Sequence, residues 1–114
     1  MGDKREFQRM FTQCQDVWSA IGDPTRQIIL RYLMEHCGEG GKRVGEIQQH
    51  TNLSRTAVSH HVKILKDAGI LTMHRISTKN YYDIDPGSSS IRNVIDFWKE
   101  AEKIMNEKMT GGIK

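Results

Sequence analysis

The sequence has 114 residues and a formal net charge of +3, with 17 lysines and arginines against 14 aspartates and glutamates. That length allows one domain with a modest core, and 37% hydrophobic with 27% charged residues excludes wholesale disorder. Because no apolar run nears the ~18 residues of a membrane span and there are only two cysteines, we expect a single domain over residues 1–114, in the cytoplasm.

Two helices are predicted in the first third of the chain. Apolar residues recur at helical spacing through REFQRMFTQCQDVWSAIGD, residues 5–23, which predicts one amphipathic helix. The next segment, DPTRQIILRYLMEHCG, has Asp23 as its N-cap and Pro24 at the first helical position, and it stops at Gly38. The GEGGK segment that follows lacks the pattern of a phosphate-binding loop, so we interpret it as a linker.

A helix-turn-helix is predicted in the middle of the chain. RVGEIQQHTN, residues 43–52, has the apolar spacing of a short third helix. Ser54 suits the N-cap of a fourth helix, RTAVSHHVKILKDAG, which ends at Gly69. The turn between them has three or four residues, as in a helix-turn-helix.

A β-hairpin and a long last helix complete the predicted fold. ILTMHRISTKNYYDID, residues 70–85, mixes β-branched and aromatic residues in two short runs, with a tip expected at Lys79 and Asn80. Apolar residues then recur at helical spacing through residues 88–109. The predicted fold class is mainly α with a small β-hairpin, in the order α-α-α-α-β-β-α, which is a winged helix-turn-helix.

The fourth helix separates into two faces at about 100° per residue. Its aliphatic residues share one arc, and His61 falls in the middle of that arc. The other arc carries cations, hydroxyls and one imidazole: Arg55, Thr56, Ser59, His60, Lys63 and Lys66. The two adjacent histidines therefore do not form one metal site, and we expect His60 on the exposed face and His61 in the core.

The polar arc suits the DNA major groove, which admits a helix and displays distinct donor and acceptor patterns. Ser59 and His60 are the candidates for contacts with base edges. The cations suited to phosphates are Arg55, Lys63 and Lys66, joined by Arg75 and Lys79 on the hairpin. The alternative is that this arc is only the charged, solvated face of a surface helix.

Three segments, DPTRQIILRYL, VGEIQQHTNLSRTAVSHHVKILKDAGIL and NYYDIDP, resemble the ArsR/SmtB family of bacterial winged-helix repressors over roughly residues 15–108. The most specific part is the spacing S-x-x-x-V-S-x-H-V-x-x-L-x-x-A-G-I-L. The resemblance implies a homodimer that binds double-stranded operator DNA, represses transcription and leaves the DNA when an effector binds. It also implies DNA contacts at Thr56, Ser59, His60 and Lys63.

The last helix gives separate support for a homodimer. Its apolar stripe covers roughly half the circumference, whereas a stripe of about 100° suffices to pack on one core. The resemblance implies that the first and last helices form the interface, here through Phe7, Phe11, Trp18, Val94, Trp98 and Met105. Alternatively, these residues cover a small core within one chain.

The metal sites of the family are not matched in this sequence. The positions of its C-x-C pair hold Arg43 and Gly45, and the last helix contains no histidine. We therefore expect no metal and no cofactor, and the effector stays open. Cys37, beside His36, is a candidate for oxidation, whereas Cys14 lies on an apolar stripe and is expected in the core.

Two other function classes compete with DNA binding. An enzyme is not expected, because the chain has no catalytic-triad motif, no glycine-rich cofactor loop and no dense carboxylate cluster. A winged helix can also bind another protein instead of DNA. The cations Arg55, Lys63 and Lys66 favour DNA, while the operator sequence, the regulated genes and the direction of regulation stay open.

Overall fold

Helix boundaries in the structure follow the local chemistry of the sequence. The computed structural model describes residues 4–113. Its elements are α1 (Lys4–Gln13), α2 (Gln15–Ile21), α3 (Pro24–Glu35), α4 (Val44–Thr51), α5 (Arg55–Asp67), β1 (Leu71–Ile76), β2 (Lys79–Ile84) and α6 (Ser89–Ile113). The Asp23 carboxylate accepts a hydrogen bond from the Arg26 backbone N–H at 3.0 Å, and Ser54 Oγ accepts one from the Ala57 N–H at 3.1 Å. Both predicted N-caps are confirmed.

The prediction of a single first helix is wrong, because the structure divides it at Cys14. The Cys14 backbone N–H bonds to the Phe11 carbonyl at 3.1 Å, which closes a tighter turn than an α-helical bond would. The Trp18 N–H then bonds to the Cys14 carbonyl at 2.9 Å and starts α2. The apolar spacing continues across this break, so periodicity alone does not reveal it.

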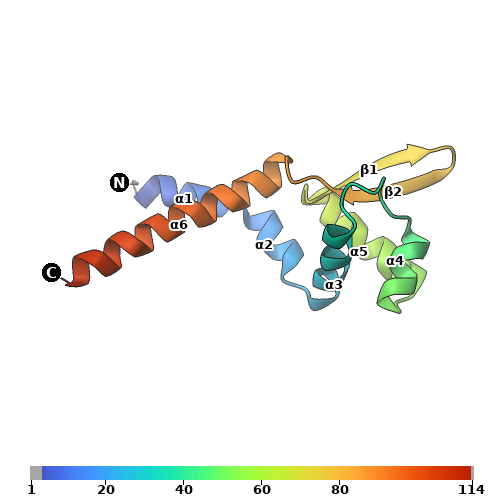
Figure 1. The fold of residues 1–114 in the computed structure, drawn as a ribbon, viewed down its shortest axis with the longest axis horizontal. Helices are drawn as coiled ribbons and strands as arrows, with labels where there is room; N and C mark the ends of the chain where they lie inside the picture. Colours follow the sequence, from blue (N-terminus) through green and yellow to red (C-terminus); the bar gives the residue numbers. More distant parts are fainter. Residues whose placement is uncertain (1–3, 114) are drawn as a thin grey trace.

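The helices α2 to α5 pack around one apolar core with the start of the hairpin. Its buried members are Val17, Ala20, Ile29, Leu30, Tyr32, Leu33, Ile47, Val58, Val62, Leu65, Ile70 and Leu71. We term residues 15–88, which hold this core and the hairpin, the head. The head contains the helix-turn-helix, formed by α4 and α5, and the wing, formed by β1 and β2 (Figure 1).

The wing is an antiparallel pair in which Leu71 faces Ile84 at the base and Ile76 faces Lys79 near the tip. Ser77 and Thr78 make the turn, so the predicted tip at Lys79 and Asn80 is wrong: these two residues begin β2. Ser77 has a positive φ of 59°. A two-residue hairpin loop needs such a conformation, and this explains why the turn closes without a glycine.

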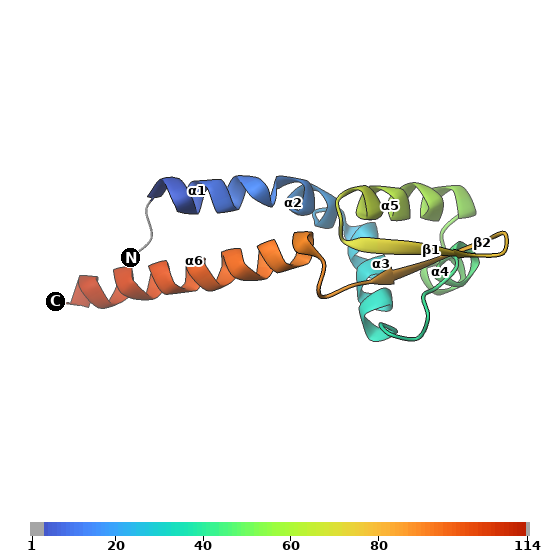
Figure 2. The same cartoon turned by 90° about the horizontal axis from the view of Figure 1, so that it is seen from above.

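The helices α1 and α6 lie alongside each other and extend away from the head, so that the molecule measures 60 × 25 × 22 Å (Figures 1 and 2). We term residues 4–14 and 89–113 the arm. Its small core contains Cys14, Phe97 and Ala101, and the Phe7 ring stacks on the Phe97 ring at 5.1 Å. Within residues 4–113, no helix is both long and apolar enough to cross a membrane.

Candidate nucleic-acid interface

One face of α5 gathers the polar residues that the sequence predicted for DNA. All six of these side chains are exposed: Arg55, Thr56, Ser59, His60, Lys63 and Lys66. On the opposite face, Val58, Val62 and Leu65 are buried in the head core, which fixes the rotation of the helix about its axis. The predicted orientation of the polar arc is confirmed, and the part these residues play in binding stays a prediction.

An ion pair lies on this exposed face. Lys63 Nζ is 2.8 Å from Asp67 Oδ2, one helical turn further on, and both side chains are more than half exposed. Their hydrogen bond raises the pKa of Lys63 and lowers the pKa of Asp67, so both groups are charged at neutral pH. An exposed pair of this kind is weak, so a DNA phosphate can take the place of the Asp67 carboxylate.

The two adjacent histidines point to different surroundings, as predicted, but His61 is not a core residue. His60 is exposed, while His61 is half-buried at the edge of the core. The Nδ1 atom of His61 lies 3.2 Å from Nη1 of Arg26. The expectation of a core position is wrong because the ring reaches a hydrogen-bond partner at the start of α3.

The hydrogen bond with Arg26 fixes the state of the His61 ring. A guanidinium has only donors, so the His61 Nδ1 atom accepts and the ring is neutral, with its proton on Nε2. Burial lowers the pKa of His61; Asp23 opposes this effect, and the neighbouring Arg26 and His60 add to it. The neutral ring is therefore the stable form at physiological pH.

Arg26 is a residue that sequence reasoning missed. It lies in the first turn of α3, and its side chain is half-buried between that turn, α2 and α5. A cation in the first turn of a helix is disfavoured by the helix dipole. That unfavourable position is a signal in the sequence that the side chain has partners elsewhere.

The wing adds further exposed cations to the head. It lies against α5 and extends away from the arm (Figure 2). Arg75 and Lys79 are exposed next to the turn, and Arg75 Nε donates to the Ser77 carbonyl at 3.1 Å. Ile76, which follows Arg75 in the chain and pairs with Lys79 across the hairpin, is 56% exposed. The wing therefore presents two cations and one apolar side chain close to its tip.

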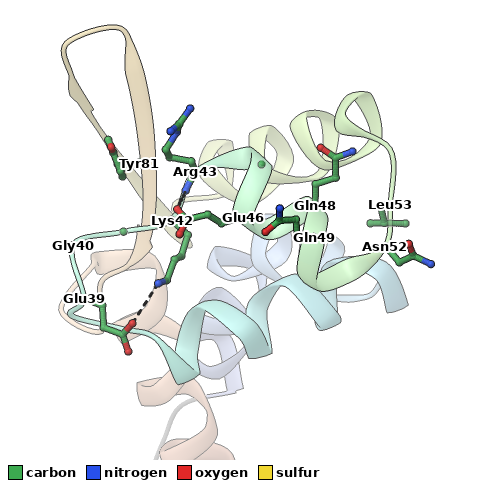
Figure 3. Close-up of a pocket in the computed structure, with 12 residues that line it drawn as sticks. Glu39, Gly40, Lys42, Arg43, Glu46, Gln48, Gln49, Asn52, Leu53 and Tyr81 are labelled. Atoms are coloured by element: carbon green, nitrogen blue, oxygen red, sulfur yellow. Dashed lines mark hydrogen bonds and ion pairs between the residues drawn. The ribbon is translucent and has the colours of Figure 1, made fainter.

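The glycine-rich segment, which the sequence suggested was only a linker, anchors the wing. The Lys42 N–H donates to the Tyr82 carbonyl and the Tyr82 N–H donates to the Lys42 carbonyl, both at 2.8 Å. Gly41 has a φ of +87°, and a Cβ there would lie 3.0 Å from Tyr81 Cβ, so this position requires glycine. Figure 3 shows the polar groove that results between this loop, α4 and Tyr81, with Lys42 and Glu39 paired at one end.

The candidate effector positions are separate from this face. Among residues 4–113, no three His, Cys, Asp or Glu side chains of one chain lie close enough together to hold a metal ion. Cys37 is exposed at the end of α3, and its thiol donates to the Ile84 carbonyl at 3.4 Å. Cys14 is buried, as predicted, and burial raises the pKa of its thiol.

The six candidate dimer residues divide between the inside and the outside of the arm. Phe7, Trp18 and Val94 are partly buried against the small arm core. Phe11, Trp98 and Met105 are 45%, 55% and 52% exposed, and Met109 beyond them is 71% exposed. Some of these residues therefore cover a core within one chain and others face outward, and their part in a dimer interface stays a prediction.

Comparison with known proteins identifies relatives over most of the chain. The model of the family described as "Bacterial regulatory protein, arsR family" matches residues 23–72. The HTH-type transcriptional regulator Rv2034 of Mycobacterium tuberculosis is 36% identical over 86 residues, which cover 74% of this chain and 77% of that protein. The transcriptional repressor SdpR of Bacillus subtilis is 39% identical over 70 residues, covering 61% of this chain and 73% of SdpR.

Solved structures share the fold. A structure described as a "predicted DNA-binding transcriptional regulator from E. coli" superposes with a TM-score of 0.65 at 25% identity, covering 87% of this chain and 99% of that one. The homodimeric winged helix-turn-helix domain of Mb0332 from Mycobacterium bovis superposes with a TM-score of 0.59 at 22% identity, covering 95% and 91%. The winged helix-turn-helix predicted from the sequence is confirmed.

Proposed function

The chain belongs to the ArsR family of bacterial regulatory proteins, and on this basis we propose that it is a homodimeric repressor that binds operator DNA and leaves it when an effector binds. Its relatives are transcriptional regulators, so the prediction of a regulator rather than an enzyme is confirmed. Dimerisation, the operator contacts and the effector are the parts that this proposal adds.

The exposed face of α5 beside the wing carries the proposal for DNA binding. A helix with short polar side chains on one face can enter the major groove, where Thr56, Ser59 and His60 would reach base edges. The longer cations would reach phosphates: Arg55, Lys63 and Lys66 on the helix, with Arg75 and Lys79 on the wing.

The outward apolar side chains of the arm carry the proposal for a homodimer. Phe11, Trp98 and Met105 lie exposed on two helices that pack together, and Trp98 meets the Trp18 ring edge-on at 6.2 Å. An exposed apolar surface of this kind marks a protein interface. A homodimeric structural neighbour supports a second copy of the chain as its partner.

For the effector, we propose chemistry at Cys37 rather than a metal at the standard sites of the family. The Cys37 thiol is exposed, and it bonds to the Ile84 carbonyl at the end of the wing strand β2. A peroxide would convert the thiol to a sulfenic acid and release water, which replaces the S–H donor and changes this contact between the end of α3 and the wing. Cys14 is buried with a raised pKa, so it is the less reactive of the two thiols.

The test is a titration of the full-length protein against the DNA upstream of its own gene at several salt concentrations. We expect affinity to fall steeply with salt, and Lys63→Ala to reduce the slope of log affinity against log salt by about one. Wild-type affinity that does not change with salt, or no binding to any selected duplex, would contradict DNA binding and favour a protein partner.

The effector is tested in the same assay with an oxidant and with divalent metals. We expect oxidant to release the wild-type protein from DNA and to leave Cys37→Ser bound. Cys14→Ser serves as the matched control and should respond like the wild type. Release by a metal alone, or equal release of wild type and Cys37→Ser by oxidant, would reject this part of the proposal.

A further inference from the structure

The Arg26 side chain joins three helices. Its Nε donates to the Ala20 carbonyl at 2.6 Å and its Nη2 to the Ser19 carbonyl at 3.5 Å, both in the last turn of α2. Its Nη1 donates to Nδ1 of His61, in the middle of α5, at 3.2 Å. Arg26 itself belongs to the first turn of α3, so one guanidinium connects α2, α3 and α5.

We infer that Arg26 is a positioning residue for DNA recognition: through His61 it holds α5 at a fixed angle to α2 and the arm, and this angle sets the spacing between the two half-sites that a dimer can bind. The inference rests on the proposed function, since it requires a dimer that binds DNA. Arg26 does not touch DNA in this arrangement, and it acts through the placement of α5.

The link matters because His61 is next to the side chains proposed to read bases. Ser59 and His60 occupy the same turn of α5 as His61, on its exposed side. In a dimer joined through the arms, the angle between the arm and the recognition helix α5 determines the distance between the two α5 helices. A dimer with fixed helices binds half-sites at one spacing, about one helical turn of DNA or a multiple of it.

Arg26 ties α5 to α2, which directly follows the arm helix α1, and a separate contact ties the end of α5 to the arm itself. Gly69 follows the helix with a φ of +79°, and the Ser88 hydroxyl donates to its carbonyl at 3.3 Å while accepting from the Ile91 N–H at 3.2 Å. Ser88 thus links the end of α5 to the first turn of α6. Attachments at the middle of α5 and just after its end fix the direction of the helix, whereas a single attachment would let it pivot.

The chemistry of arginine suits this position. Its guanidinium carries five N–H donors in a rigid fork, which here meets two carbonyls and one imidazole nitrogen. Lysine has the same charge on a flexible stem without that fork. The side-chain amide of the neighbouring Gln27 donates to the Ile21 carbonyl of α2, at 2.7 Å, and ties α2 to α3; within residues 4–113 no hydrogen bond joins this amide to α5. Gln27 therefore provides a matched control.

The experiment measures binding of full-length dimers to duplexes that carry two copies of a half-site selected by the wild type. The spacer between the copies changes by one base pair at a time. We expect the wild type to prefer one spacing by roughly tenfold over a spacer two base pairs longer or shorter, as two fixed recognition helices require. Arg26→Gln should reduce this preference to about threefold or less, whereas Gln27→Ala should keep the wild-type profile.

Two further variants separate positioning from folding. Arg26→Lys keeps the charge and should still show the broadened profile, because it lacks the fork. His61→Leu removes the acceptor on α5 and should broaden the profile in the same way. If Arg26→Gln does not fold, as judged by circular dichroism, His61→Leu decides the question.

The outcomes separate this inference from the proposed function. Wild-type protein that binds no selected duplex contradicts the proposed function itself. Wild-type protein with one preferred spacing, together with folded Arg26→Gln or His61→Leu dimers that keep the same preference, overturns the inference alone. A uniform loss of affinity at all spacings in those variants also overturns it, because that result indicates a structural role without positioning.

Discussion

The head and the arm bury their apolar residues to very different extents. Among the described residues, the head core holds twelve buried side chains from four helices and the start of the hairpin, and the arm core holds three. Most apolar residues of the head lie inside, although Ile28, Met34, Met73 and Ile76 are exposed. The arm leaves large apolar side chains exposed along α1 and α6.

Because of this difference, the head is the part of the molecule whose core is complete within one chain. The head satisfies its own core, so its stability should depend on packing within the chain. The arm exposes Phe11, Trp98, Met105 and Met109, each at 45% or more, and the proposed dimer would bury such side chains against a second copy. Four measurements test this contrast and the assignment of the two histidines of α5.

The largest effect is expected in the head core. Leu33 is 1% exposed, and Leu33→Ala should lower the free energy of unfolding by about 2–5 kcal/mol, because it removes packed methyl groups and leaves a cavity. Chemical denaturation followed by circular dichroism measures this. Met34→Ala, at a neighbouring residue that is 58% exposed, should stay within about 0.5 kcal/mol of the wild type. Equal effects of the two changes would mean that the head core is not packed as described.

The next effect is expected in the arm. Met105 is 52% exposed, and Met105→Glu should raise the dimer dissociation constant by about thirtyfold, because the dimer would bury an unpaired charge. Analytical ultracentrifugation measures the constant. Met34→Glu, on the outer face of α3 in the head, is the control and should leave it unchanged. A dimer that tolerates Met105→Glu would place the interface elsewhere.

A smaller effect separates the two adjacent histidines of α5. His60 is exposed, so His60→Ala should weaken specific DNA binding by about 1–2 kcal/mol and leave the free energy of unfolding within about 0.5 kcal/mol. His61→Ala should lower the free energy of unfolding by about 1 kcal/mol, since it removes the acceptor of Arg26. DNA titration and chemical denaturation of both variants provide the measurements. The same loss of stability in both would contradict the assignment.

The smallest effect is a pH dependence at the edge of the head core. Burial lowers the pKa of His61 from its ordinary value of 6.5. As the pH falls, the unfolded chain therefore takes up a proton at this residue at a higher pH than the folded chain does. Its contribution to stability is therefore fully present above pH 6.5 and is lost as the pH falls through the folded pKa. Unfolding of the wild type and His61→Gln at pH 7.5 and 5.5 measures this, with the smaller loss expected in the variant. An equal loss in both would assign the pH dependence to other groups.

The sequence determined the elements and most of the candidate site. Asp23, Pro24, Ser54 and Gly69 mark helix ends through capping and backbone preferences that act within a few residues. The spacing of Val58, Val62 and Leu65 determined which face of α5 is buried, and so which polar side chains are exposed. These results follow from local physical chemistry and from periodicity, both of which a single sequence displays.

The tertiary structure alone decided the remaining features. The break at Cys14, the half-buried position of His61 and the pairing of Lys42 with Tyr82 depend on how distant segments meet. Arg26 and His61 are 35 positions apart, and no local pattern shows that a guanidinium in the first turn of α3 reaches the recognition helix. A periodic pattern gives the direction of each side chain about its own helix, but the partner it meets is fixed only when the helices pack together.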